Sequence, residues 1–166
     1  MLILHCQENV LVNQNGMPYL ANFELATIIN IAAIESGGAR WIAPELFTGA
    51  KPDTNRLHDV LPLEFTRFSD IWSFAMLALE LLSDELPFLD KITDMAVVDA
   101  LMEGERPKQL RSRQVIEHGL NHELWQYLWR CWEPSPTNRL RLQSLHDVLD
   151  TLATQWRPAN QVRSMS

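Results

Sequence analysis

The longest apolar stretch of the chain lies near its middle, between Ser69 and Phe88. Apolar side chains recur there on every side of a helix and leave almost no polar face after the first turn: Ile71, Trp72, Phe74, Met76, Leu77, Leu79, Leu81 and Leu82. No side of such a helix suits water, so we expect it to be buried and to form the centre on which other elements pack. The stretch is too short for a bilayer span, and Glu80 stands too close to its middle.

Both ends of this central helix are marked in the sequence. Thr66 or Ser69 can cap its start, and Asp70 places a carboxylate in the first turn, where the helix dipole favours negative charge. At the other end lies Leu-Pro-Phe at 86–88. Proline cannot continue a helix, and it biases the residue before it away from helical geometry. We therefore predict that the helix stops at residues 86–88.

The first part of the chain predicts a small β-hairpin. Residues 10–12, Val-Leu-Val, are β-prone, and Asn15-Gly16 is a strong signal for a tight turn. Met17 to Ala21 would form the returning strand.

Beyond the hairpin the pattern is helical. Pro44, in A-P-E-L, suits a first helical turn, whereas residues 49–66 have the composition of a loop. Thr93 or Asp94 can cap one later helix and Asn121 another. Helical spacing recurs in three segments: residues 93–103, 121–132 and 141–156. The sequence thus predicts a mainly α fold, with a short β-hairpin and about five helices around a buried central helix.

Composition narrows the class of protein. The 166 residues are 46% hydrophobic and 21% charged, which is ordinary for one globular domain. A formal net charge of −7 argues against nucleic acid, whose binding depends on clustered Lys and Arg. The short basic cluster from Lys108 to Arg113 is interpreted as a solvated turn. Cys6 and Cys131 lie far apart and indicate neither a zinc site nor a disulfide framework.

The start of the chain, MLILHC, has neither a basic leader nor an apolar stretch long enough for a signal peptide. We therefore expect a cytoplasmic protein, or a nuclear one, without a membrane partner.

Four short signatures follow one another along the chain: E-N-V-L-V at 8–12, G-G-A-R-W-I-A-P-E-L at 37–46, S-D-I-W-S-F-A at 69–75 and C-W-E-P-S-P-T-N-R-L at 131–140. Each alone is weak evidence. Together, over roughly residues 4–156, they resemble the C-terminal lobe of a protein kinase of the tyrosine-kinase-like (TKL) group. A helical module unrelated to kinases would explain the periodicity but not the four ordered signatures.

The resemblance implies a partial kinase domain over residues 1–156, followed by a flexible tail over 157–166. Within the domain, residues 1–22 would hold a remnant of the catalytic loop and the hairpin. Residues 22–45 would form the activation segment, and residues 46–156 the helical subdomain.

Several positions then take structural roles. The resemblance implies that Glu45, in A-P-E, and Arg139 form a buried ion pair that fixes the activation segment to the lobe. Asp70 would reach from the central helix to the backbone of the catalytic loop, and its place in the first turn also suits the helix dipole. Three tryptophans are interpreted as core residues: Trp72, Trp125 and Trp132.

The catalytic positions depart from the family pattern. Phosphoryl transfer needs a carboxylate that accepts the proton of the substrate hydroxyl, and H-R-D-L-x-x-x-N supplies it. With Asn9 as the asparagine of this pattern, Leu2, Ile3 and Leu4 stand where His, Arg and Asp belong. Leu4 cannot accept a proton. His5 is a neighbouring candidate base, but it would point elsewhere on the loop and has no orienting partner in the sequence.

The metal position departs as well. Asn22-Phe23-Glu24 stands where the family has D-F-G, so Asn9 is retained while Asn22 replaces a carboxylate with a neutral amide. Mg²⁺ prefers carboxylate oxygen. Glu24 replaces a glycine and restricts the backbone, and its own carboxylate would reach a metal only in a displaced geometry. The family uses ATP and Mg²⁺, and we expect neither to bind tightly at this degenerate site.

No residues before Met1 supply the glycine-rich loop or the lysine strand, so we expect the small lobe to be absent. Without base, metal carboxylate and phosphate cover, this chain should not transfer phosphate. The leading hypothesis is a pseudokinase that acts as a binding or scaffold module. Its protein partner would cover the face that normally meets the small lobe, close to the apolar residues Leu2, Ile3, Leu4 and Phe23.

The alternative hypothesis is an enzyme. Met1 would then be a wrong start, and the chain a truncated part of a longer ATP-dependent serine/threonine or dual-specificity protein kinase. The missing H-R-D lies at the edge of the chain, which fits this alternative. Asn22 and Glu24 lie inside a regular strand and turn, which does not.

Overall fold

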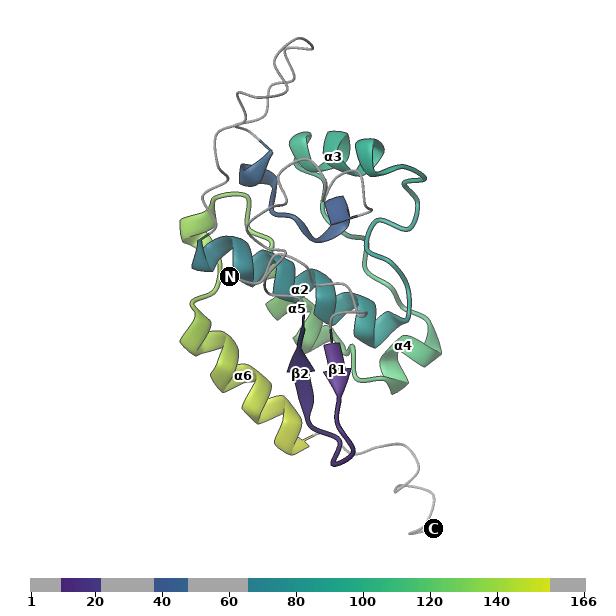
Figure 1. Cartoon of the computed structure of the whole chain (residues 1–166), viewed down its shortest axis with the longest axis vertical. Coiled ribbons are helices and arrows are strands. Elements are labelled where there is room, and N and C mark those ends of the chain that lie inside the picture. Colours follow the sequence, from purple (N-terminus) through teal and green to yellow (C-terminus); the bar gives the residue numbers. More distant parts are fainter. Residues whose placement is uncertain (1–9, 22–37, 48–65, 156–166) are drawn as a thin grey trace.

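The computed structural model describes residues 10–21, 38–47 and 66–155, and these residues are mostly helical with one small sheet (Figure 1). The fold class predicted from the sequence is confirmed. In chain order the elements are β1 Val10–Val12, β2 Pro18–Leu20, the 3₁₀ helices η3 Gly38–Trp41 and η4 Pro44–Leu46, α2 Arg67–Ser83, α3 Asp94–Met102, α4 Arg113–Glu117, α5 His122–Cys131, the 3₁₀ helix η5 Pro136–Asn138, and α6 Leu142–Gln155.

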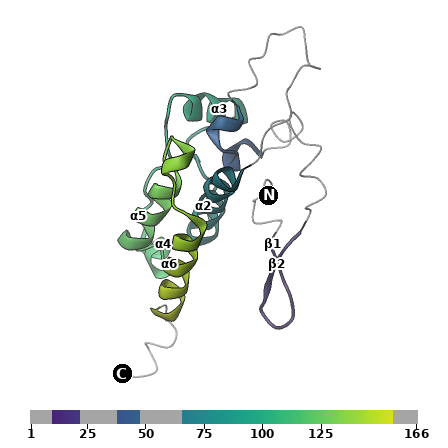
Figure 2. The same cartoon turned by 90° about the vertical axis from the view of Figure 1, so that its left-hand side faces the viewer.

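Helix α2 crosses the middle of the molecule. One side of it meets η3, which with η4 lies between α2 and α3, and α5 packs on α2 as well (Figure 1). Figure 2 shows the hairpin on one side of the helices and α5 on the opposite side. Within the described residues no helix is both long and apolar enough to cross a bilayer.

The start of α2 follows from its capping residues. The Thr66 hydroxyl accepts hydrogen bonds from the backbone N–H groups of Phe68 and Ser69, at 3.2 and 3.3 Å. In return, the Ser69 hydroxyl accepts from the Thr66 N–H at 3.0 Å. This reciprocal arrangement is a capping box, and it satisfies donors that the first helical turn leaves without partners. The predicted start is confirmed, with both candidates taking part.

The end of α2 differs from the prediction. The helix ends at Ser83, before the Leu-Pro-Phe sequence, because Asp84 takes a left-handed conformation with φ of 59°. The Ser83 hydroxyl donates to the Leu79 carbonyl at 2.7 Å and accepts from the Glu85 N–H at 3.1 Å. These local bonds turn the chain before proline is reached.

Burial of α2 is nearly as predicted. Its buried apolar residues are Ile71, Trp72, Ala75, Met76, Leu77 and Leu79. Phe74 and Leu82 are partly buried, whereas Leu81 is 49% exposed, so the expectation of burial on every side is wrong at that position.

Later helices complete the core. Thr93 caps α3 through the Ala96 N–H, and Asn121 caps α5 through the Leu124 N–H, as two of the sequence signals predict. The three tryptophans assigned to the core are at most 7% exposed. The rings of Trp125 and Trp132 meet edge to face, with 5.6 Å between their centroids.

Helix α4 was not predicted. Ser112 caps it by accepting from the Val115 N–H, and five residues are too few to show a helical period. The basic cluster interpreted as a turn therefore runs up to the first residue of a short helix. Val115 is 2% exposed and anchors α4 to the core.

The hairpin has the predicted strands and turn, with slightly different limits. Strands β1 and β2 pair antiparallel, with Leu11 opposite Tyr19. The Asn13 side-chain oxygen accepts from the N–H groups of Asn15 and Met17, both at 2.9 Å, and Gly16 has φ of 77°. Glycine adopts this left-handed geometry without steric cost, which is why the Asn-Gly signal works here.

Candidate functional site

Residues 38–47, which we call the anchored segment, contain η3 and η4 and carry the second of the four signatures. Six of its ten residues belong to the hydrophobic core: Ala39, Trp41, Ile42, Ala43, Leu46 and Phe47. Polar contacts from three of its side chains fix it to elements distant in sequence. The residues that make these contacts are Arg40, Trp41 and Glu45.

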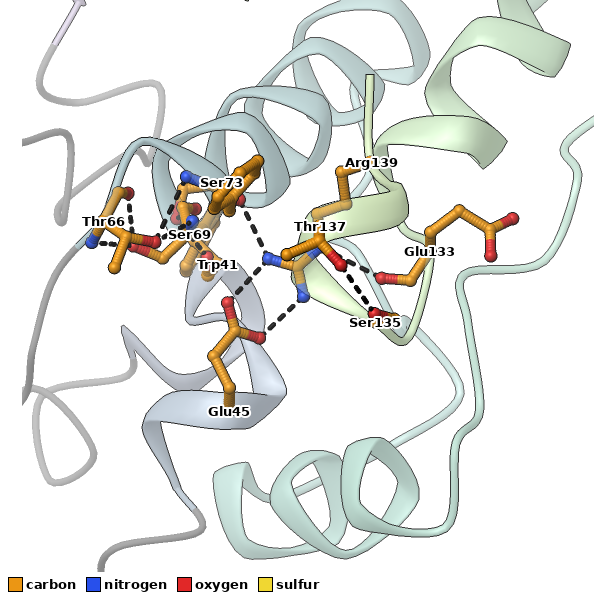
Figure 3. A network of polar contacts seen from close by, with 10 residues as sticks. Trp41, Glu45, Thr66, Ser69, Ser73, Glu133, Ser135, Thr137 and Arg139 are labelled. Atoms are coloured by element: carbon orange, nitrogen blue, oxygen red, sulfur yellow. Dashed lines mark hydrogen bonds and ion pairs between the residues drawn. The ribbon is translucent and has the colours of Figure 1, made fainter. Parts of the chain in front are cut away.

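Glu45 and Arg139, which the sequence analysis pairs, form a two-pronged ion pair (Figure 3). Arg139 Nη1 lies 2.7 Å from Glu45 Oε1, and Nη2 lies 2.6 Å from Oε2. The Arg139 side chain has no exposed surface, while that of Glu45 is 27% exposed. Paired parallel bonds of this kind are shorter and stronger than neutral ones, and they fix orientation as well as distance.

The remaining contacts of Arg139 explain why arginine suits this position. Its Nη1 also donates to the Phe68 carbonyl at 2.8 Å, and its Nε donates to the Glu133 carbonyl at 3.0 Å. The guanidinium lies 4.9 Å from the centre of the Trp72 ring. One planar group therefore joins the anchored segment, the start of α2 and the turn before η5, which the single ammonium of lysine could not do.

Trp41 makes the second attachment. Its carbonyl accepts a hydrogen bond from the Ser73 hydroxyl at 2.7 Å, and its indole N–H donates to Glu80 Oε2 at 3.1 Å. Ser73 and Glu80 are both buried on α2. The lone carboxylate in the middle of the apolar helix thus reaches across to the anchored segment.

Arg40 makes the third attachment, and it is buried. Its guanidinium donates to the carbonyls of Pro87, Phe88 and Lys91, each at 2.8 Å, and lies 4.0 Å from a carboxylate oxygen of Asp94. Phe88 has φ of 55°, an unfavourable conformation for a bulky residue, and two of these bonds hold the carbonyls on either side of that strain. Arg40 therefore fixes the loop between α2 and α3.

Together these contacts hold backbone in place. They join the anchored segment to α2, to the loop after it and to the turn before η5. We call this set of contacts, made by Arg40, Trp41, Glu45 and Arg139, the platform. Among the residues that the structure describes, no group of three or more His, Cys, Asp or Glu side chains is placed to hold a metal ion.

The candidate catalytic and metal residues lie elsewhere. Leu4, Asn9 and Asn22 are outside the described residues, as are His5 and Glu24. Their assignment, and the nucleotide and Mg²⁺ site that it implies, therefore remains a prediction from the sequence.

Asp70 does lie in the described part. It is half-buried in the first turn of α2 and its backbone N–H donates to the Thr66 carbonyl at 3.1 Å. The loop expected to receive its side chain is outside the described residues, as is most of the predicted activation segment, of which residues 38–45 are described. The predicted domain limits likewise remain predictions.

Electrostatic shifts occur at the edges of the platform. A hydrogen bond from Lys108 lowers the pKa of Asp90, and a hydrogen bond to Glu105 raises the pKa of Lys91. The Asp90 side chain is 44% exposed and that of Lys91 is 23% exposed. In the core, burial raises the pKa of the Cys131 thiol to about 12, which makes it a poor nucleophile at neutral pH.

Sequence reasoning gave no role to Arg40, Ser73 or Glu80. A signal existed for Glu80, because a single carboxylate inside an apolar helix needs a buried partner. Arg40 lies in the second signature, but nothing in the sequence around it indicates that its guanidinium is buried. Its partners are backbone carbonyls, which every residue carries, so only the fold identifies them.

Comparisons with known proteins agree with the four signatures. The family model described as protein tyrosine and serine/threonine kinase matches residues 5–149. The chain is 26% identical over 147 residues to the serine/threonine-protein kinase STY17 of Arabidopsis thaliana, covering 87% of this chain and 22% of that protein. It is 26% identical over 154 residues to the mouse tyrosine-protein kinase TXK, covering 89% and 25%.

A third relative has a different description. The human scaffold protein ILK is 28% identical over 113 residues, which cover 68% of this chain and 21% of that protein. The chain thus spans about a fifth to a quarter of the length of these three relatives.

Proposed function

The chain belongs to the protein tyrosine and serine/threonine kinase family, and from this premise we propose that it is a pseudokinase-like module that binds other proteins and does not transfer phosphate. The observation that carries the proposal is Leu4 in the sequence: with Asn9 taken as the asparagine of the H-R-D-L-x-x-x-N pattern, Leu4 stands where the catalytic aspartate belongs. A hydrocarbon side chain cannot accept the proton of a substrate hydroxyl, and that transfer is commonly worth about 10²–10⁴ in rate.

The metal position supports the same proposal. The donor set offered by Asn9 and Asn22 is two neutral amides, where the family has one amide and one carboxylate. Mg²⁺ holds tightly to carboxylate oxygen and poorly to amides alone. This donor set does not fit a tightly bound Mg²⁺–ATP complex.

The platform supports the binding half of the proposal. The Glu45–Arg139 pair, the Trp41 contacts and the Arg40 contacts join elements of the lobe through residues that are not candidate catalytic groups. A lobe that keeps its scaffold and has lost its catalytic set is suited to presenting a surface. The relative named as a scaffold protein fits this role, and a partner on the face near Leu2, Ile3, Leu4 and Phe23 is part of the proposal.

The proposal includes two finer assignments from the sequence: the four signatures together favour the tyrosine-kinase-like group, and the place of action is cytoplasmic or nuclear.

The alternative is part of a longer, active protein kinase. Two observations favour it: STY17 and TXK are described as kinases, and the chain spans only about a fifth to a quarter of each. A polypeptide as long as these relatives could supply the residues that bind phosphate.

The test is transfer of labelled phosphate from ATP by the full chain, in Mg²⁺ and separately in Mn²⁺, to a mixed serine, threonine and tyrosine acceptor. We expect no transfer above that of a heat-denatured sample. Transfer that is abolished by Asn9→Ala and by Asn22→Ala, in variants that keep their circular dichroism spectrum, would establish the enzyme instead.

A second measurement separates loss of nucleotide binding from loss of chemistry. We expect the melting temperature of the chain to be unchanged by ATP with Mg²⁺, because a ligand stabilises only a site that it occupies. A rise in melting temperature without phosphate transfer would keep the pseudokinase proposal and place nucleotide binding within it.

A further inference from the structure

The outer face of α5 borders an open groove of about 740 Å³. The other wall is the loop between α3 and α4, which contributes Arg106, Lys108 and Gln109. Helix α5 lies on the side of the molecule away from the hairpin (Figure 2). None of the residues that carry the platform lines this groove, which we call the α5 groove.

The helix builds its side of the groove as a continuous stripe. Gln126, Trp129 and Arg130 follow His122 by four, seven and eight positions. This spacing places all four side chains on one face of the helix. The opposite face of α5 enters the core through Leu124, Leu128 and Cys131. The stripe is about 12 Å long, which matches roughly three to four residues of an extended peptide.

The centre of the groove is an exposed indole held in place. Trp129 is 41% exposed, although its ring lies 6.2 Å from that of buried Trp125. Trp129 makes a second contact with Arg106, whose guanidinium lies 4.6 Å from the centre of the Trp129 ring. The Arg106 side chain is 13% exposed. Tryptophan and arginine side chains that are already held in place lose little entropy on binding, and residues of these types dominate the binding energy of interfaces.

The charge of the groove is opposite to that of the chain. Its lining contains Arg106, Lys108 and Arg130 and no aspartate or glutamate, in a chain that carries 21 acidic and 14 basic residues. Arg106 is paired with Glu133, whose Oε2 lies 3.6 Å from Arg106 Nη2, so the charge of the groove comes mainly from Lys108 and Arg130. Within the described residues the Arg130 side chain has no hydrogen bond or ion pair. Lys108 bonds to Asp90 at 2.7 Å, but its side chain is 74% exposed, and such surface pairs contribute little because solvent competes for them.

We propose that the α5 groove binds a short acidic segment of a partner protein, with an apolar or aromatic side chain of that segment against Trp129 and its carboxylates toward Arg130 and Lys108. The two amide side chains of the groove, on Gln109 and Gln126, suit the backbone of an extended peptide. Nucleic acid fits less well, because three cations on a chain of net charge −7 give a weak electrostatic hold on a polyanion. The inference deepens the binding role proposed above and rests on it.

The test uses the full chain without nucleotide and a fluorescein-labelled peptide of sequence DEWED, followed by fluorescence polarisation. We expect saturable binding that weakens several-fold as NaCl is raised from about 50 to about 500 mM. Equal binding of the uncharged peptide NQWQN, or of a labelled oligothymidine of about ten nucleotides, would overturn the proposal. So would the absence of binding at about 1 mM protein.

Variants locate the site. Arg130→Glu and Trp129→Ala are each expected to weaken DEWED binding about tenfold or more. The matched control is Arg141→Glu, which makes the same charge change at an exposed residue that does not line the groove, and it should change affinity less than about twofold. Equal losses in Arg130→Glu and Arg141→Glu would show a general charge effect and overturn the site. Because ATP is absent, the result does not depend on the outcome of the phosphate-transfer assay.

Discussion

At the scale of single residues, the two side chains of the Glu45–Arg139 pair differ in their exposure to water. The Arg139 side chain has no exposed surface, whereas that of Glu45 keeps about a quarter of its exposure. Glu45→Ala would leave a guanidinium unpaired inside the protein. We expect this variant to lose about 3–5 kcal/mol of unfolding free energy, measured by urea denaturation.

A matched control for this variant lies on α4. Arg113 and Glu117 are also paired, at 2.8 Å, but their side chains are 87% and 49% exposed. Glu117→Ala should therefore cost less than about 1 kcal/mol, because solvent replaces the lost partner. Similar losses in the two variants would mean that the ion pair of Glu45 contributes no more than a surface contact.

Cys131 provides a second prediction at this scale. Burial raises the pKa of its thiol from 9.0 to about 12. In a Cys6→Ser background, which leaves one thiol in the chain, we expect no reaction with a thiol reagent at pH 8 until urea unfolds the protein. Rapid labelling of the native state would show that the surroundings of α5 open without global unfolding.

The same shift has a consequence for stability. Since the folded pKa lies above the ordinary value, the unfolded chain releases the thiol proton first as the pH rises. The contribution to stability is complete below pH 9 and is lost as the pH approaches about 12. We expect urea midpoints to fall across this interval, and to fall less steeply in Cys131→Ala.

At the scale of elements, the capping box of α2 depends on the hydroxyl of Thr66. Its hydroxyl accepts from two N–H groups of the first turn. Thr66→Ala should lower the unfolding free energy by about 0.5–2 kcal/mol, whereas Thr66→Ser, which keeps the acceptor, should lose much less. Equal losses would locate the effect in the threonine methyl group and not in the cap.

The elements also show which features a sequence can predict. Caps at Thr66, Thr93 and Asn121 were found because a side chain bonds to backbone two or three residues away, so the information is local. The end of α2 was missed because Asp84 carries no residue-type signal for a left-handed conformation as strong as that of glycine. Short α4 was missed because its one deep anchor, Val115, defines no period.

At the scale of the whole molecule, the same division applies to the site. The pairing of Glu45 with Arg139, 94 positions apart, came from ordered signatures and not from any physical property of either residue. The Arg40 contacts escaped prediction because their acceptors are carbonyls of a loop whose path depends on the packing of α2 and α3. The groove beside α5 was not predictable from the sequence either, because its two walls, α5 and residues 106–109, meet only in the folded chain.

The hairpin and the helices should differ in stability within this molecule. Strands β1 and β2 have three residues each, and four of the large side chains of the hairpin are 56–65% exposed: Leu11, Val12, Met17 and Tyr19. A two-stranded hairpin without cover is at best marginally stable, whereas the buried amides of α2 exchange only when the core opens. We expect hydrogen exchange of residues 10–20 to finish while the middle of α2 remains protected, and Glu45→Ala to accelerate exchange in α2 but not in the hairpin. Protection of the hairpin equal to that of α2 would mean that a partner or a second copy covers its exposed face, and sedimentation of the same sample would distinguish the second copy.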